Sequence, residues 1–360
     1  KKVAILTISD NANLGNRLQN YATQEFLKQQ GLEVETIQNY IGYKNKVYLI
    51  IKRFLKLFLA NKKYKREKNF KEFNKKNMRF SKYIIRNKKN YPKVNDKYDY
   101  FITGSDQVWN PKFERTSDID FLTFAEKKKR ISFSASFGVS EIPEDLKNYY
   151  MERLNGLNKI SVREERGEEI IEELTGRTDV EVLLDPTMLV KTEKWDSVMK
   201  RPRDLEKING KKYILNYFLG NLSEERKIEI ERIAKENDCE IINILNDDDA
   251  FYSCGPSEFL YLEKNAFLIC TDSFHSSVFA ILFNRPFIVF DREDSNTKMN
   301  SRIETLLKKF DLEDRWFKNN IKENQLVANY STKKALEIER NKAKKFIEEA
   351  IKEGIWNAKQ

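Results

Sequence analysis

The sequence predicts an α/β protein built from two Rossmann-like lobes that face a shared cleft. Short apolar runs alternate with helical patterns from about residue 3, and the same alternation begins again at about residue 213. A chain of 360 residues also exceeds the usual size of one hydrophobic core, so two domains are expected. Polar residues gather directly after the apolar runs, which is where parallel sheets bind ligands.

The opening of the chain predicts a βαβ unit and therefore a parallel sheet. Val3–Ile8 is the first expected strand, a helix follows from about Arg17 to Gln29 and stops at Gly31, and Leu32–Ile37 is the next strand. The loop between the first strand and the helix contains Gly15 but lacks the GxGxxG spacing. A standard dinucleotide-binding loop is therefore not indicated.

The rest of the first lobe, expected over residues 1–190, repeats strands and helices. The second lobe is expected over 211–330, and a terminal helix over 331–360. Between the lobes, Lys191 to Gly210 is charged, contains Pro202 and is interpreted as a linker. The further strands expected in the first lobe are Tyr98–Thr103, Ile131–Ser136, Lys159–Val162 and Val180–Leu184, with a helix at Glu164–Leu174. In the second lobe the expected elements are strands Tyr213–Phe218, Glu240–Leu245, Ala266–Ile269 and Phe287–Phe290, helices Ser223–Glu236, Val278–Phe283 and Asn300–Phe310, and the terminal helix Lys333–Glu353.

His275 is the only histidine in the chain, and its position is informative. It follows the expected strand Ala266–Ile269, and Ser273 is a plausible N-cap that places His275 in the first turn of the next helix. That is the carboxyl edge of a sheet, where helix N–H groups also favour anions. A lone histidine is as often a structural residue, so catalysis and a satisfied structural role are balanced interpretations.

The net charge of +10 is concentrated in one segment. Residues 52–93 contain 17 Lys and Arg against Glu67 and Glu72. Within a basic helical insertion expected at about 44–93, Tyr48–Leu59 mixes apolar and basic residues at helical spacing, as in helices that lie on anionic membranes. The favoured interpretation is a helical insertion with a solvated lysine face. Binding to nucleic acid is not expected, because no recognised motif accompanies the patch.

Composition excludes several other classes of protein. The three cysteines show no CxxC spacing, so neither a disulfide framework nor a zinc site is indicated. No apolar run reaches the roughly 18 residues of a membrane span, and the start has no signal-peptide pattern. We therefore expect a cytoplasmic protein, with a peripheral place at the inner face of the membrane as the alternative that the basic segment raises.

Candidate site residues follow several of the expected strands. Arg163 suits a carboxylate or phosphate, with an ion pair to Glu164 or Glu168 as the structural alternative. Asp106 is a candidate base or hydroxyl acceptor, with a capping role as the structural alternative. Asp185 is also a candidate, with the alternative that an aspartate before a proline commonly starts a turn. No metal-ligand motif is present, so no metal site is expected.

Five motifs occur in a set order: Asn13–Gln19, Gly104–Pro111, Ser161–Glu164, Asp185–Thr187 and Thr271–His275. In this arrangement the chain resembles the polysaccharide pyruvyl transferase family over roughly residues 3 to 316. Many relatives have Gly or Ala after the histidine, whereas this chain has Ser276. The resemblance implies a fold similar to that of B-type glycosyltransferases.

The resemblance also implies an activity. A pyruvyl transferase moves pyruvate from phosphoenolpyruvate onto two hydroxyls of a sugar, in a polysaccharide of the exopolysaccharide or capsule type or in its precursor, forming a cyclic ketal and releasing phosphate. Phosphoenolpyruvate is then the donor substrate, no cofactor or metal is needed, and the acceptor is a sugar that can be lipid-linked. His275 and Arg163 are the candidate catalytic residues. The candidate donor-binding residues are Arg163, Ser273, His275, Ser276 and Arg302, and the candidate acceptor-binding residues are Asn16, Ser105, Asp106 and Gln107.

Two other functions remain open from the sequence. The two-lobed fold also supports a glycosyltransferase that uses a nucleotide-sugar donor. A non-catalytic accessory protein, associated with sugar or membrane, is the third interpretation.

Overall fold

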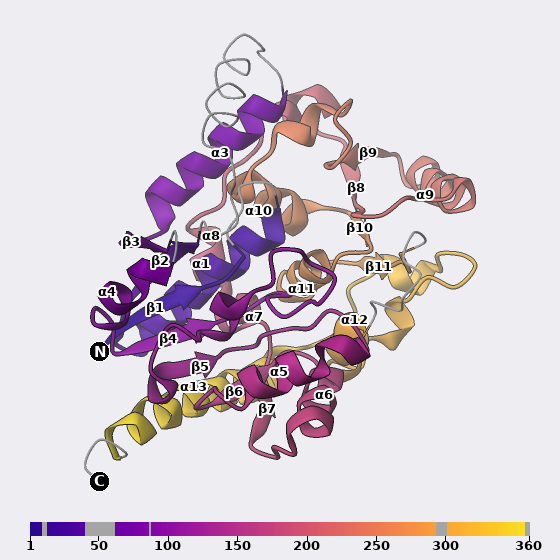
Figure 1. The fold of residues 1–360 in the computed structure, drawn as a ribbon. Helices are drawn as coiled ribbons and strands as arrows, with labels where there is room; N and C mark the ends of the chain where they lie inside the picture. Colours follow the sequence, from indigo (N-terminus) through magenta and orange to yellow (C-terminus); the bar gives the residue numbers. More distant parts are fainter. Residues whose placement is uncertain (9–12, 40–61, 86–87, 293–300, 357–360) are drawn as a thin grey trace.

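The protein is described by a computed structural model over residues 1–8, 13–39, 62–85, 88–292 and 301–356. Two parallel sheets dominate it, as expected from the alternation of strands and helices (Figure 1). The sheet of the first lobe has the order β3-β2-β1-β4-β5, and every neighbouring pair is parallel. Its strands are β1 Lys2–Leu6, β2 Glu33–Asn39, β3 Phe80–Ile85, β4 Tyr100–Thr103 and β5 Arg130–Ser132.

Two further strands extend this lobe beyond β5. β6 (Ile160–Val162) and β7 (Val180–Val182) pair in parallel with each other. A bridge between Ile131 and Lys159 connects them to the edge of the first sheet. Helix α5 (Lys147–Leu154) precedes β6, and helix α6 (Glu165–Thr175) connects β6 to β7. The carboxyl ends of seven strands thus lie along one edge of this lobe.

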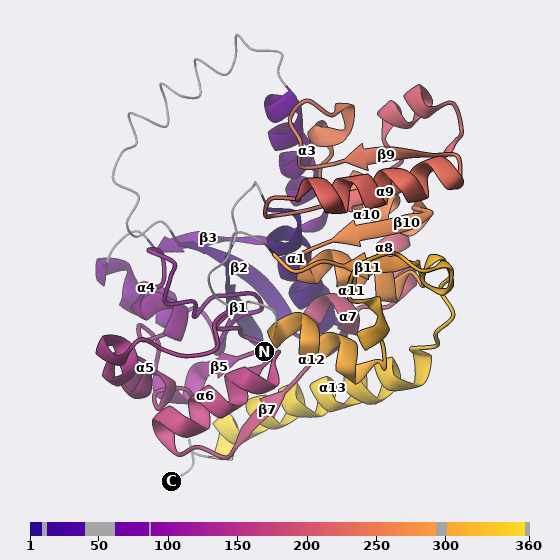
Figure 2. The ribbon, with the colours of Figure 1, turned by 90° about the vertical axis from the view of Figure 1, so that its right-hand side faces the viewer.

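The second lobe is a smaller parallel sheet with the order β11-β10-β8-β9. Helix α9 connects β8 to β9, α10 precedes β10 in the chain, and α11 follows β10 (Figure 2). The strands are β8 Lys212–Tyr217, β9 Cys239–Asn243, β10 Leu268–Thr271 and β11 Phe287–Val289, and the helices are α9 Glu224–Glu236, α10 Pro256–Asn265 and α11 Phe274–Leu282.

The segment expected to be a linker is folded and packs between the lobes. After α7 (Pro186–Leu189), residues 191–210 contain α8 (Thr192–Asp196) and a 3-10 helix at Arg203–Ile208. Trp195 is fully buried, with its ring 5.4 Å from that of Tyr21 in the first lobe and 5.1 Å from that of Phe279 in the second. The connection therefore belongs to the hydrophobic core that the two lobes share.

The chain returns to the first lobe at its end. α12 (Ser301–Lys309) belongs to the second lobe, whereas α13 (Lys333–Trp356) crosses beneath both lobes (Figure 2). The ring of Phe346 stacks on Phe133 at 6.2 Å, and the Tyr100 hydroxyl donates to the carbonyl of Ile351 at 2.6 Å. The terminal helix is thus packed on the sheet of the first lobe.

The basic insertion differs from the expectation of a continuous helical segment. α3 (Lys62–Asn77) and the short α4 (Tyr91–Asn95) are helical, but residues 80–85 between them form β3, the edge strand of the first sheet. The helical expectation for 80–85 was wrong because this run pairs with β2, and Ser81 and Ile85 are buried on one face of the strand. The expected amphipathic helix Tyr48–Leu59 lies outside the described residues.

Helix α3 packs against the second lobe. Arg66 donates to the carbonyls of Tyr252 at 3.0 Å and Cys254 at 3.3 Å, and Asn69 donates to that of Ser253 at 2.9 Å. Lys62 donates to the carbonyls of Asp247 and Asp248. Part of the basic charge of the insertion is therefore used within the protein. Among the described helices, none is long and apolar enough to cross a membrane.

Candidate active site

The candidate site lies where strands of both lobes end. Ser105 and Asp106 follow β4, Arg163 follows β6, and Asp185 follows β7 at the N-cap of α7. His275 follows β10 of the second lobe, in the first turn of α11. All five residues are at least nine-tenths buried, and contacts between their side chains connect the lobes.

Asp185 is the centre of this cluster. Its Oδ2 accepts a hydrogen bond from the Ser105 hydroxyl at 2.6 Å and from Arg163 Nη1 at 2.9 Å, and it lies 3.7 Å from His275 Nε2. Its Oδ1 accepts from both the backbone N–H and the hydroxyl of Thr187. One oxygen of Asp185 therefore caps α7, as expected for an aspartate that starts a turn. The other oxygen lies in the cluster, where it is available for a functional role.

Electrostatics keep the two aspartates ionised. Burial alone raises the pKa of Asp185, but His275, Arg163 and Ser105 outweigh it and hold that pKa well below its ordinary value. Burial likewise opposes ionisation of Asp106, yet the charge of Arg163 brings its pKa below the usual range. Both carboxylates are therefore negative at neutral pH, which gives the cluster two buried anions.

Both Nη groups of Arg163 are bonded to these carboxylates. Its Nη2 donates to Asp106 Oδ1 at 3.1 Å while Nη1 serves Asp185, and its Nε lies 3.9 Å from Glu164 Oε2. The side chain has no exposed surface, so the ion pair expected as an alternative is present but involves more partners than Glu164. This geometry differs from an open fork that waits for a donor anion, and it makes Arg163 a residue that positions the two aspartates.

Glu164 is a third buried carboxyl beside the arginine. It accepts from the Ser136 hydroxyl at 2.8 Å and from the backbone N–H of Phe137 at 3.0 Å. Burial raises its pKa in spite of the nearby charge of Arg163. It joins the ends of β5 and β6, so its contacts are those of a structural residue.

Arg302 provides the second guanidinium of the site. It lies in the first turn of α12, is buried, and faces the amide oxygen of Gln107 at 3.0 and 3.2 Å. The ring of Phe274 lies between the two arginines, 4.5 Å from the guanidinium carbon of Arg163 and 5.9 Å from that of Arg302. Burial and the charge of Arg163 lower the pKa of Arg302 to about 10. Its Nε has no hydrogen-bond partner among the described residues.

The position of His275 depends on a glycine of the first lobe. A Cβ atom added at Gly15 would lie 2.3 Å from His275 Nδ1, far closer than such contacts allow. Gly15 and Asn16 begin α1 (Leu14–Gln29), where the Asn13 side chain accepts from the Asn16 N–H at 3.1 Å. The helix N-terminus of one lobe thus approaches the helix N-terminus of the other, with the histidine between them.

The residues that flank His275 differ in orientation. Ser273 is the N-cap residue of α11, as expected, although its side chain makes no capping hydrogen bond. Ser276 is fully buried, and its hydroxyl donates to Glu263 on α10 at 2.6 Å. The side chain of Ser276 is therefore directed into the interface between α10 and α11 rather than into the cluster, which corrects the expectation that it contacts the donor.

The structure thus brings together most of the predicted residues and adds Glu164 and Gly15. Ser105, Asp106, Arg163 and His275 share one cluster. Gln107 pairs with Arg302 at its margin. Asp185, for which the sequence left a turn and a functional role open, is at the centre of the cluster. Glu164 was expected only as an ion-pair partner of Arg163, and Gly15 only as part of a motif; each lies at a predicted strand or helix boundary, and that placement was the available signal. Among the described residues, no group of three or more potential ligands is arranged to hold a metal ion.

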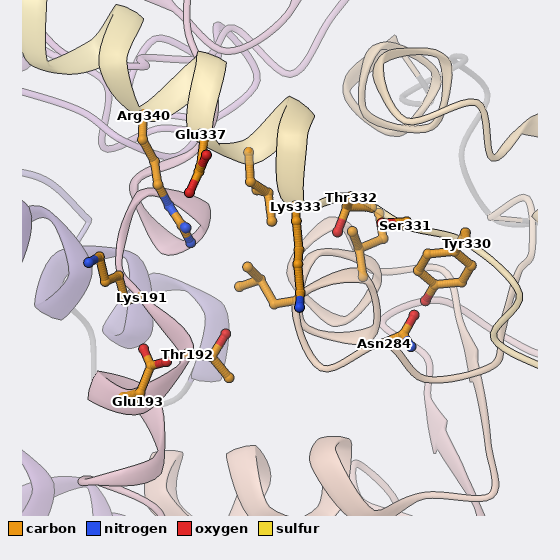
Figure 3. A pocket seen from close by; sticks show the side chains of 13 residues that line it. Lys191, Thr192, Glu193, Asn284, Tyr330, Ser331, Thr332, Lys333, Glu337 and Arg340 are labelled. Atoms are coloured by element: carbon orange, nitrogen blue, oxygen red, sulfur yellow. The ribbon is translucent and has the colours of Figure 1, made fainter.

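A separate hollow of about 450 Å³ lies at the other end of α11 (Figure 3). Arg340 and Lys333 extend into it from α13, and Lys191 lines it from the connection between the lobes, with its amino group directed away from Arg340. Its walls contain none of the candidate site residues. The hollow therefore lies where the connection between the lobes meets α13, and it is separate from the candidate site.

Comparison with known proteins identifies the family. The fold is similar to that of the UDP-GlcNAc 2-epimerase from Neisseria meningitidis, solved bound to UDP-GlcNAc, with a TM-score of 0.51 and 11% identity over 98% of this chain and 100% of the other. A putative UDP-N-acetylglucosamine 2-epimerase from Listeria monocytogenes gives a TM-score of 0.51 and 13% identity over 94% of both chains. These likenesses show the two-lobed fold of B-type glycosyltransferases.

No curated protein matches the sequence. The family model for polysaccharide pyruvyl transferase, however, matches residues 13–295, which include every residue of the cluster described above apart from Arg302. A match over that much of the chain shows its family, and the resemblance seen in the motifs is confirmed. The chain is a transferase that belongs to the polysaccharide pyruvyl transferase family.

Proposed function

We propose that the protein transfers pyruvate from phosphoenolpyruvate to two hydroxyls of a sugar, forming a cyclic ketal and releasing phosphate. The observation that carries the proposal is the contact between His275 of the second lobe and the buried Asp185–Arg163–Ser105 group of the first, at 3.7 Å between His275 Nε2 and Asp185 Oδ2. A histidine whose Nε2 faces a buried carboxylate is suited to donate and accept protons at that atom.

In the proposed reaction, His275 donates a proton to the methylene carbon of phosphoenolpyruvate, and the C2 carbon gains positive charge. A sugar hydroxyl attacks C2, the C–O bond to phosphate breaks, and a neighbouring hydroxyl closes the ring. Of the two hydroxyl protons, one replaces the proton that His275 gave to the carbon, and the other leaves on phosphate. The negative charge of Asp185 stabilises the protonated histidine.

The donor carries a carboxylate and a phosphate, and the buried cations of the site match them. Both Nη groups of Arg163 are paired with carboxylates, whereas Arg302 faces the amide of Gln107 and has an Nε group without a partner among the described residues, so we assign the direct contact with a donor anion to Arg302. Arg163 contributes its charge while it holds Asp106 and Asp185 in place. Ser273 contributes through the N-terminus of α11, where backbone N–H groups favour anions.

The acceptor side of the proposal uses the first lobe. Asn16 lies in the first turn of α1, and Ser105, Asp106 and Gln107 follow β4. Their amide, hydroxyl and carboxylate groups suit sugar hydroxyls. We also propose that the reaction takes place in the cytoplasm, with an acceptor that belongs to a polysaccharide or to its lipid-linked precursor. No nucleotide or metal enters this scheme.

The test is release of phosphate from phosphoenolpyruvate in the presence of a panel of sugar acceptors, with the ketal product identified by mass spectrometry. His275→Ala should reduce transfer by about 100-fold or more, the usual scale for loss of a positioned acid or base. A folded H275A protein with normal turnover would remove this histidine from the mechanism. Release of a nucleotide from a nucleotide-sugar would instead support a glycosyltransferase, and the absence of both reactions would support a non-catalytic protein.

A further inference from the structure

A second hollow lies on the same edge of the second sheet as His275. It has a volume of about 820 Å³, within the range of small-molecule binding sites. Its walls are the ends of β8 and β9, the loop after β8 and one side of α9, which packs beside β9 (Figure 2). None of the catalytic cluster residues lines it. The hollow is therefore a distinct feature beside the site.

Amide side chains are concentrated in this hollow. Asn216 on β8 and Asn243 on β9 are direct register partners, and Asn216 Nδ2 donates to Asn243 Oδ1 at 2.9 Å. This bond fixes the plane of the Asn243 amide and leaves its Nδ2 group as an oriented donor in the wall of the hollow. Two more asparagines, Asn221 and Asn246, line the exposed margin. Each amide offers both donors and an acceptor, which is the pattern that sugar hydroxyls match.

Apolar surface completes the lining. Phe218, Leu222 and Leu245 line it together with Ile230 of α9. The ring of Phe218 packs edge-on against Phe290 at 5.3 Å, so it is held in one orientation. A rigid ring beside fixed amides provides an apolar face and a polar edge, which suits a sugar ring with its C–H face and its hydroxyls.

The charge of the hollow selects against ionic ligands. Among the described residues that line it, Lys227 and Glu231 are the charged ones; both lie on α9, and their charges cancel. A diphosphate or a polyanion would find one lysine there opposed by one glutamate. The chemistry of the walls therefore favours a neutral ligand.

The hollow is connected to the catalytic helix through Asp272. Its Oδ1 accepts from the Leu219 N–H at 2.7 Å and its Oδ2 from the Gly220 N–H at 2.8 Å, which fixes the loop that forms one wall of the hollow. Asp272 is buried and lies three residues before His275. Ligand held in the hollow is thus adjacent to the turn that presents the histidine.

We infer that this hollow is a subsite for neutral sugar residues of the acceptor chain, next to the sugar that receives pyruvate. That the bound sugars belong to the acceptor rests on the proposed function. That the hollow binds neutral oligosaccharides is argued from its lining residues alone. It predicts that the protein recognises a chain of sugars rather than a single sugar.

The experiment measures the binding of neutral oligosaccharides of one to six residues, built from glucose, galactose, mannose and N-acetylglucosamine, by titration calorimetry with the full-length protein. We expect binding that strengthens with chain length. Asn243→Ala and Asn221→Ala should each raise the Kd of the best oligosaccharide by about 3- to 10-fold, the range for loss of one hydrogen bond. Asn221 is exposed, so its variant tests the subsite without disturbing the fold.

Asn265→Ala is the matched control, because Asn265 is an exposed asparagine at the end of α10, outside the hollow. Its Kd should equal that of the wild type. The inference is overturned if no oligosaccharide binds, or if the Asn243 and Asn221 variants bind as the wild type does. Phosphate release from phosphoenolpyruvate, measured on the same proteins, separates the two proposals. Oligosaccharide binding that depends on Asn243, without any transfer, refutes only the pyruvyl transfer. Transfer by a protein whose oligosaccharide binding does not depend on Asn243 refutes only the subsite.

Discussion

Asp185→Asn tests the arrangement of the candidate site most directly. The substitution keeps the shape of the side chain but removes the charge that compensates Arg163. It also places an amide group or a neutral oxygen where the carboxylate now accepts from Ser105 at 2.6 Å and from Arg163 at 2.9 Å. Because Ser105 and Arg163 are both buried, water cannot replace the hydrogen bonds that they lose.

The magnitude follows from the burial of the pair. Removing one partner of a buried ion pair typically costs about 3–5 kcal/mol. With an unfolding entropy of about 2.1 cal/mol/K per residue, a chain of this length should lose roughly 4–7 °C in Tm. The matched control is Asp196→Asn, whose carboxylate pairs with Lys264 at the surface, and which should change Tm by about 1 °C or less because exposed pairs contribute about 0–1 kcal/mol.

The pH dependence gives this prediction a second signature. The pKa of Asp185 is lower in the folded protein than the value of about 3.9 expected for an unfolded chain. Its contribution to stability is therefore fully present above about pH 4 and is lost as the pH falls through the folded pKa. The difference in Tm between wild type and the variant should be constant near neutral pH and should shrink below about pH 4. Scanning calorimetry between pH 3 and 8 measures both; a Tm within 1 °C of the wild type at pH 7 would refute the central role of Asp185.

Three further substitutions or conditions test other parts of the site. Gly15→Ala should reduce transfer by about 100-fold, because the new methyl group displaces the His275 ring; normal turnover would show that the ring can move without cost. Arg302→Lys should raise the KM for phosphoenolpyruvate at least about 10-fold, and an unchanged KM in steady-state kinetics would place the donor elsewhere. In sedimentation with anionic liposomes at low salt, we expect the protein in the supernatant, because Lys62 and Arg66 of α3 donate hydrogen bonds to carbonyls of the second lobe. Salt-sensitive recovery with the liposomes would instead support membrane docking by residues 48–93.

The sequence by itself determined the order of strands and helices and the identity of the family. Buried parallel strands are near-continuous apolar runs, so Val3–Ile8 and Tyr98–Thr103 were visible as strands without any tertiary information. Because the carboxyl ends of parallel strands share one edge, it also followed that Ser105 and Arg163 face the same region of the first lobe, and that His275 lies at the corresponding edge of the second. Local pattern and chain direction are sufficient for these conclusions.

Only the tertiary structure decided which partners these residues take. Arg163 could have held Glu164, Glu168 or a ligand, and it is the packing of β4, β6 and β7 that gives it Asp106 and Asp185. The sequence likewise offered no sign that Ser276 turns toward Glu263, since the two are 13 residues apart and meet through the packing of α10 on α11. The strand β3 was missed because an edge strand buries one face only, and its basic surroundings resemble an exposed helix. Contacts between distant segments depend on how helices and strands pack in three dimensions, and a local pattern of residue types carries no record of that packing.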